Sequence, residues 1–235
     1  MIFQTTWRNI RMLTNDISLI ALLSFFTLLP FIIAGGTCFI KFSIVLIMVR
    51  NALGIQQVPS TLTLNGIAII LTAFVMMPVT QSITEYIEKN NIDFNNSRSV
   101  SLLMDNGLVG YRDYLVKYSD PDLIRYFNKV QQKHREGEPE PVLEYFEMSS
   151  LPLMTLMPAY ALSEIQSAFK IAFYIYVPFV VIDMVVSSIL LALGMMMMSP
   201  VTISIPIKLI LFVAMDGWAL VTKGLISQYA ELMTL

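Results

Sequence analysis

Apolar residues gather in four stretches of this chain, and the first covers residues 17–40 without a charged side chain. A helix over these residues is long enough to cross about 30 Å of hydrocarbon. Pro30 and the Gly35-Gly36 pair interrupt the stretch, so we expect a kinked or broken helix. A cleaved signal peptide is the alternative interpretation. The length of the stretch and the lack of a small-residue cleavage site after it favour a retained helix.

The second stretch lies between Arg50 and Glu85 and is most apolar from Leu62 to Val79. Residues 85–150, which follow it, carry twelve acidic and eight basic side chains. Asp120-Pro121 in this region is typical of a helix N-cap followed by proline in the first turn. Apolar residues recur on both sides of this pair at helical spacing: Val100, Leu103, Leu108, Tyr111, Leu115 and Tyr118 before it, and Leu123, Ile124, Phe127 and Val130 after it. The pattern predicts a small helical insert, which a solvated break over residues 136–141 interrupts.

The third and fourth stretches lie between Leu151 and the C-terminus. A helical face over residues 161–176 ends before Pro178, and we expect two spans after it, over Phe179–Met198 and Ile203–Leu225. The predicted fold class is all-α, with about four hydrophobic spans. Its expected parts are a leader with a first hydrophobic hairpin over residues 1–84, the hydrophilic insert over 85–150, and a second hairpin over 151–235.

The distribution of charge predicts how these parts face the membrane. The segment 41–60 looks like a short loop whose charges, Lys41 and Arg50, are both basic, whereas the insert has a net charge of 8 − 12 = −4. Basic loops tend to stay in the cytoplasm. We therefore expect this loop, and residues 199–206, on the cytoplasmic side and the insert on the outside.

The composition agrees with a lipid-exposed chain and excludes several functional classes. Hydrophobic residues make up 56% and charged residues 14%, whereas soluble domains carry about a quarter charged residues. The net charge of −2 and the lack of nucleic-acid-binding motifs predict no nucleic acid partner. Cys38 is the only cysteine and His134 the only histidine, so no disulfide within the chain, no metal site and no cofactor are expected.

No catalytic motif is recognisable, neither a metalloprotease or serine-hydrolase signature nor a glycine-rich phosphate loop. Asp183 and Asp216 could in principle form the pair of an intramembrane aspartyl protease. Asp216-Gly217 lacks the glycine context of that class, so we expect no enzyme.

Charged side chains inside the apolar stretches are the first candidate functional feature. Asp183, Lys208 and Asp216 lie within the expected spans, and Glu164 and Lys170 lie just before one. An ionised group at the bilayer centre costs several kcal/mol unless it is paired, so such groups normally face protein or water. Structural pairing between helices and an ion relay both remain open. In either case these segments need partners.

A run of four methionines is the second feature: Met195, Met196, Met197 and Met198, between Gly194 and Ser199-Pro200. Consecutive methionines in a helix would point all round the axis, and the flanking glycine and proline favour a loop or a helix end. Methionine is soft and apolar, so a ring of such loops could seal a pore and deform around a passing chain. The alternative is that these methionines simply fill a membrane helix.

Two long segments resemble the signatures of the FliP/SctR family. The first is Pro158–Ile165 followed by Ala168–Ile171, and the second is Pro178–Asp183 continuing through Ser187-Ser188 and Leu190. The likeness also covers Gly194–Pro200 and, near the front, residues 36–54. It is greatest to the branch found in virulence-associated, non-flagellar type III secretion systems. It begins near Met12, which is either the true start or is preceded by a short extension of eleven residues.

The resemblance implies a pore-forming core subunit of the export apparatus in the bacterial inner membrane, with portions raised into the periplasmic space. Members of the family form a homo-oligomer, a pentamer, with SctS-like and SctT-like subunits. An SctU-like protein wraps the base, inner-rod and needle subunits attach above, and unfolded polypeptides pass through. By correspondence, Glu164 and Lys208 are expected to form a salt bridge between neighbouring subunits, and Met195–Met198 to close the pore. Asp183, Asp216 and Lys170 are expected to be buried structural charges.

Two other functions remain open at this point. A secondary transporter or ion channel would use Asp183, Lys208 and Asp216 to couple ions. A scaffold would nucleate the assembly while substrates pass through other subunits.

Overall fold

The computed structural model describes residues 23–24, 27, 30–55, 57–92, 97–132, 148–195 and 197–232. Every element in these ranges is helical and no strand occurs among them, so the all-α prediction is confirmed. The residues expected to be a leader, the solvated break at 136–141, His134 and Met196 lie outside the described residues.

The first apolar stretch is broken where the glycine pair predicts it. A helix over Pro30–Gly36 meets α2, Phe39–Ala52, at an angle of 82°. The expected loop at 41–60 is wrong, because α2 continues past Lys41 to Ala52. Both basic residues are buried in it, with Lys41 4% and Arg50 8% exposed. The orientation rule counts basic residues in the loops that flank a span, so Lys41, buried inside a helix, gives no support for the predicted orientation.

A short turn after α2 leads into the second stretch. Arg50 donates hydrogen bonds to the Pro59 carbonyl (3.2 Å) and the Thr61 hydroxyl (3.0 Å) across this turn. Thr61–Val75 then forms α3, and Met77–Lys89 forms α4 at an angle of 53° to it. The predicted span is therefore a bent pair of helices.

The hydrophilic insert is helical, as predicted. It contains α5 (Ser97–Leu102), a π-helical turn η1 (Leu103–Gly107), α6 (Val109–Tyr118) and α7 (Pro121–Gln132). Asp120 caps α7, because its carboxylate accepts a hydrogen bond of 2.9 Å from the Asp122 amide.

The third stretch is one continuous helix, α9, over 40 residues from Leu153 to Ala192. The predicted separation at Pro178 is therefore wrong. A proline removes one backbone donor, which apolar helices tolerate when neighbouring helices support them. The fourth stretch is a bent pair of helices, because α10 (Pro200–Ala214) and α11 (Gly217–Ser227) meet at 60°. By length and composition, α9 alone among the described helices can cross a membrane, and up to four crossings result if each bent pair is one span.

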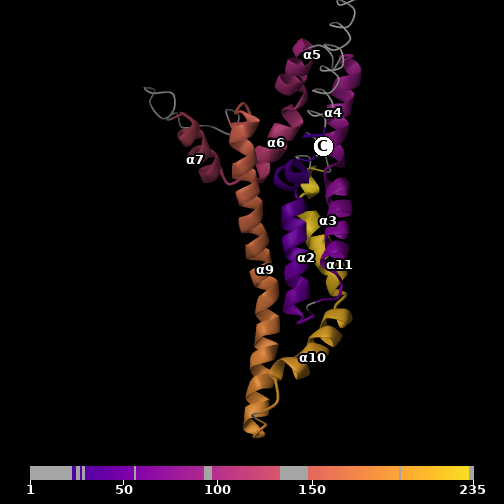
Figure 1. The fold of residues 1–235 in the computed structure, drawn as a ribbon, viewed down its shortest axis with the longest axis vertical. Helices are drawn as coiled ribbons and strands as arrows, with labels where there is room; N and C mark the ends of the chain where they lie inside the picture. Colours follow the sequence, from indigo (N-terminus) through magenta and orange to yellow (C-terminus); the bar gives the residue numbers. More distant parts are fainter. Residues whose placement is uncertain are drawn as a thin grey trace, which may run out of the picture.

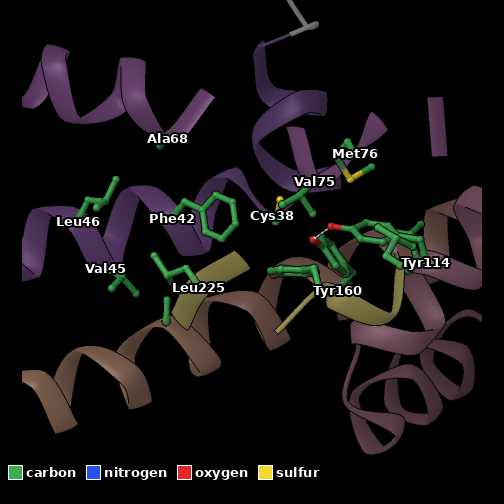
Figure 2. Packing of buried hydrophobic residues seen from close by; sticks show 14 of the residues in the cluster. Cys38, Phe42, Val45, Leu46, Ala68, Val75, Met76, Tyr114, Tyr160 and Leu225 are labelled. Atoms are coloured by element: carbon green, nitrogen blue, oxygen red, sulfur yellow. Dashed lines mark hydrogen bonds between the residues drawn. The ribbon is translucent and has the colours of Figure 1, made fainter. Parts of the chain in front are cut away.

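The helices pack around α2 (Figure 1). This helix lies against α9 on one side and α3 on the other, and α6 and α7 pack on the first half of α9. Figure 2 shows the core between them, where Phe42, Leu46, Ala68 and Leu225 are buried together. At the end of the molecule far from the insert, α9 and α10 extend beyond the other helices and meet at a tip (Figure 1).

Candidate functional site

A buried ion pair joins α2 to α9 near the insert. Lys41 Nζ lies 2.9 Å from Glu164 Oε1, and the two side chains are 5% and 1% exposed. Tyr229, in the turn after α11, donates its hydroxyl to Glu164 Oε2 at 2.5 Å. The Lys41 ammonium also lies 4.7 Å from the centre of the Tyr229 ring. The charges of Lys41 and Glu164 are therefore matched within the chain.

Tyrosines extend this site into the insert. The Tyr118 ring of α6 lies tilted against the Tyr229 ring, with 4.7 Å between the ring centres, and the Tyr114 ring centre lies 5.3 Å from that of Tyr118. Tyr114 and Tyr160 share a hydrogen bond between their hydroxyls (Figure 2). Burial raises the pKa of the Tyr114 phenol well above its usual value. Burial and then the Glu164 carboxylate raise the pKa of Tyr229 as well, so both phenols stay protonated and can donate.

A second charged site closes the α9–α10 hairpin. Lys208 Nζ lies 2.6 Å from Asp183 Oδ2 and donates to the Ala52 carbonyl at 3.2 Å, and Ser204 donates to Asp183 Oδ1 at 2.5 Å. Lys208 is buried, whereas 35% of the Asp183 side chain is exposed. One lysine thus ties α10 both to α9 and to the end of α2, where backbone carbonyls carry partial negative charge.

Beyond this site the chain turns through the methionine segment. Gly194 adopts a positive φ of 73°, which ends α9 as glycine commonly does at a helix C-terminus. Met195, Met197 and Met198 follow in a loop before α10 begins at Pro200. The loop predicted from the flanking glycine and proline is confirmed. Met197 is completely exposed, while Met195 is 40% and Met198 46% exposed.

The structure brings together some of the residues singled out from the sequence and separates others. Glu164 and Lys208 do not pair within the chain, and each has a different intrachain partner. A contact between them across subunits stays a prediction. Lys170 and Asp216 are exposed on the chain by itself, so their burial stays a prediction for the assembled protein.

Two residues of the first site are absent from the sequence-based predictions. The sequence pattern assigns Lys41 to a loop, although the mostly apolar residues on both sides of it indicate that it would need an acidic partner if the helix continued. Tyr229 carried no such signal, because a tyrosine near the C-terminus of an apolar helix has many ordinary roles. Across the described residues, no group of three or more metal-ligating side chains is present.

Comparisons with known proteins match nearly the whole chain. Residues 22–225 match the FliP family. The surface presentation of antigens protein SpaP of Salmonella typhimurium is 60% identical over 94% of this chain and 99% of its own length. The corresponding protein of Shigella flexneri is 54% identical over 93% and 98%. The Yop proteins translocation protein R of Yersinia pestis is 43% identical over 92% and 98%.

Proposed function

The chain belongs to the FliP family, and from this premise we propose that it is a pore-forming subunit through which unfolded proteins leave the bacterial cytoplasm. Its resemblance to that family in the sequence is confirmed. The chain is a component of a type III protein-secretion apparatus and not an enzyme. The pore, its gate, the number of copies and the partner subunits belong to the proposal.

The single observation that carries the proposal is the exposed methionine loop at the tip of the α9–α10 hairpin. Met197 is completely exposed, and the Asp183–Lys208 site ties together the two helices that carry the loop. An apolar loop carried on a braced arm suits a constriction in a ring of copies, because methionine can repack around different passing side chains.

The surface of the hairpin supports an assembly of several copies. Large apolar residues are exposed on α9, among them Phe173, Val181 and Ile189, and on α10, among them Ile210 and Val213. Exposed apolar surface of this extent marks contact with lipid or with other chains. In the proposed assembly the chain forms a homo-oligomer, a pentamer, in the inner membrane, with SctS-, SctT- and SctU-like subunits and rod and needle proteins around it.

The charged sites support a conduit more than an ion-coupled transporter. Glu164 and Asp183 each accept bonds from a lysine and from a hydroxyl group of the same chain. Groups matched in this way hold helices together, whereas a relay needs groups that exchange protons along a path. The energy for export then comes from other components of the apparatus.

The proposal is tested by photo-crosslinking from position 197 in cells whose apparatus holds a secretion substrate stalled in transit. We expect a crosslink between the residue replacing Met197 and the stalled polypeptide. The matched control replaces Phe173, an exposed residue in α9 far from the loop, and should give no substrate crosslink. Crosslinks from position 197 to other subunits only, with the substrate demonstrably stalled, would make this chain a scaffold and not the gate.

The expected pair between subunits is tested by charge reversal. A Glu164→Lys, Lys208→Glu double variant restores assembly if these two residues meet across subunits. It fails if the intrachain pairs dominate, because the lysine introduced at position 164 would face Lys41 and the glutamate introduced at position 208 would face Asp183.

A further inference from the structure

Three charged side chains on the second hairpin have no partner among the described residues: Asp216, Lys170 and Lys223. Asp216 lies at the kink between α10 and α11, and Lys170 lies on α9, and both are exposed. Neither side chain has a hydrogen bond or ion pair to any described residue. Their neighbours along the chain include exposed apolar residues such as Phe169, Val213 and Leu220. A charge in such surroundings is costly in lipid, so each needs a partner outside its own chain.

The kink builds a notch around Asp216. Asp216 has a positive φ of 51°, and the Phe212 ring occupies the place where a Cβ on the next residue, Gly217, would lie. The result is a cavity of about 260 Å³ lined by Phe212, Val213, Asp216, Gly217, Trp218 and Ala219. We call this cavity the Asp216 notch.

The chemistry of the Asp216 notch fits a cationic side chain. Its carboxylate is the one ionisable group of the lining, and the rings of Phe212 and Trp218 meet edge to face at 5.4 Å beside it. A lysine or arginine can lay its methylene groups along such apolar walls and place its charge on the carboxylate and the aromatic ring.

Lys170 lies one to two helical turns away from Asp216 along the hairpin. Its neighbour Ile171 lines a second cavity together with Leu220 and Gly224 of α11. These α11 residues follow Asp216 by one to two turns, which is about 6–12 Å along a helix. Copies that are related by a rotation about an axis roughly parallel to α9, and are also shifted along that axis by about this distance, would bring Lys170 of one copy near Asp216 of the next.

We infer that the Asp216 notch of one copy receives Lys170 of a neighbouring copy, and that this contact fixes how copies are arranged around the pore. The inference rests on the proposed homo-oligomer and names a contact within it. It differs from the expected Glu164–Lys208 pair, because both residues of that pair already have partners in their own chain.

The inference is tested with cysteines in the full chain, produced with the rest of the apparatus. One copy carries Asp216→Cys and a second, distinguishable copy carries Lys170→Cys. The native Cys38 is fully buried and should not react. We expect oxidation to join the two copies into a dimer. The matched control replaces Lys170→Cys with Lys223→Cys, an exposed lysine of the same hairpin, and should give at least about tenfold less dimer.

Charge reversal provides a second readout if the cysteine variants assemble poorly. Asp216→Lys or Lys170→Asp alone should lower the amount of oligomer on a native gel about tenfold, and the double variant should restore it. Failure of the double variant to exceed either single variant overturns the contact, as does equal dimer with the Lys223→Cys control. An unaltered chain that runs as a single copy would instead refute the proposed homo-oligomer itself.

Discussion

Two ion pairs in this chain have the same length and very different burial. Lys41–Glu164 and Lys117–Glu231 both measure 2.9 Å, but their side chains are 5% and 1% exposed in the first pair and 31% and 81% in the second. If burial decides the contribution of an ion pair, Lys41→Met should destabilise the chain far more than Lys117→Met. Methionine keeps the approximate length and the apolar stem of lysine and removes only its charge.

The expected magnitudes follow from what each substitution leaves behind. Lys41→Met leaves the Glu164 carboxylate buried without its counter-ion, which costs about 3–5 kcal/mol. The Tyr229 hydroxyl still donates to that carboxylate, so the lower end of this range is expected. Lys117→Met breaks a pair that is largely in solvent and should cost about 0–1 kcal/mol.

A double variant distinguishes the free energy lost with the ion pair from the cost of leaving one buried charge without its counter-ion. Lys41→Met with Glu164→Met removes both buried charges and leaves only the Tyr229 hydroxyl without its acceptor, a loss of about 1–3 kcal/mol. The double variant should therefore be more stable than Lys41→Met alone. The single variant Glu164→Met should be as unstable as Lys41→Met, because it leaves the Lys41 ammonium buried without its counter-ion.

The measurement is reversible unfolding of the purified full chain in mixed micelles, with increasing denaturing detergent, followed by fluorescence. Lys117→Met is the control, because it shows how much stability is lost when an exposed lysine is replaced by methionine under the same conditions. A loss below about 1 kcal/mol for Lys41→Met, or equal losses for Lys41→Met and Lys117→Met, would refute the reasoning. It would mean that Glu164 is not held as a buried, charged acceptor in the protein.

Two glycine substitutions give further predictions from close contacts. Gly36→Ala should break the hydrogen bond that the Tyr111 hydroxyl donates to the Gly36 carbonyl, since a Cβ there would collide with that hydroxyl oxygen. Gly35→Ala meets nothing within 4 Å, so limited proteolysis of the insert should rise for Gly36→Ala only. Gly217→Ala should lower the free energy of unfolding by about 1–3 kcal/mol, because its Cβ would collide with the Phe212 ring and the ring would have to move. If unfolding in detergent were unchanged, the close packing at the kink would be refuted.

The helical class and the places where glycine dictates the backbone could be predicted from the sequence. Gly35-Gly36 marked the break before α2, and Gly194 with Pro200 marked the methionine loop, because glycine and proline change backbone geometry whatever surrounds them. Pro178 was misleading for the same local reason. The helix α9 continues through Pro178 to Ala192, and Phe179, the residue after Pro178, is buried against Phe212 of α10, a contact that the local sequence does not show.

The charges were harder to assign, because pairing is a property of the fold and not of the local sequence. Glu164 lies 123 positions after Lys41 (164 − 41), and no spacing rule connects them. A lysine in an apolar stretch indicates the end of a span when it is unpaired, and the sequence does not show whether it is. Asp183 and Lys208 are recognisable as unusual, and their closeness in sequence allows pairing, but only the hairpin brings them to 2.6 Å.

The charges that are paired within the chain stabilise its fold, whereas the charges without a partner in the chain favour its assembly. The pairs Lys41–Glu164 and Asp183–Lys208 are complete within one chain, one near the insert and one between α9 and α10, so they can form before any other copy arrives. Lys170 and Asp216 have no partner in the described part of the chain, and they lie on surfaces that are apolar and exposed. A subunit with this arrangement can first reach a defined hairpin in the membrane and only then meet its neighbours. Because a charge in lipid costs more free energy without a partner than with one, the unmatched groups favour assembled copies over single ones.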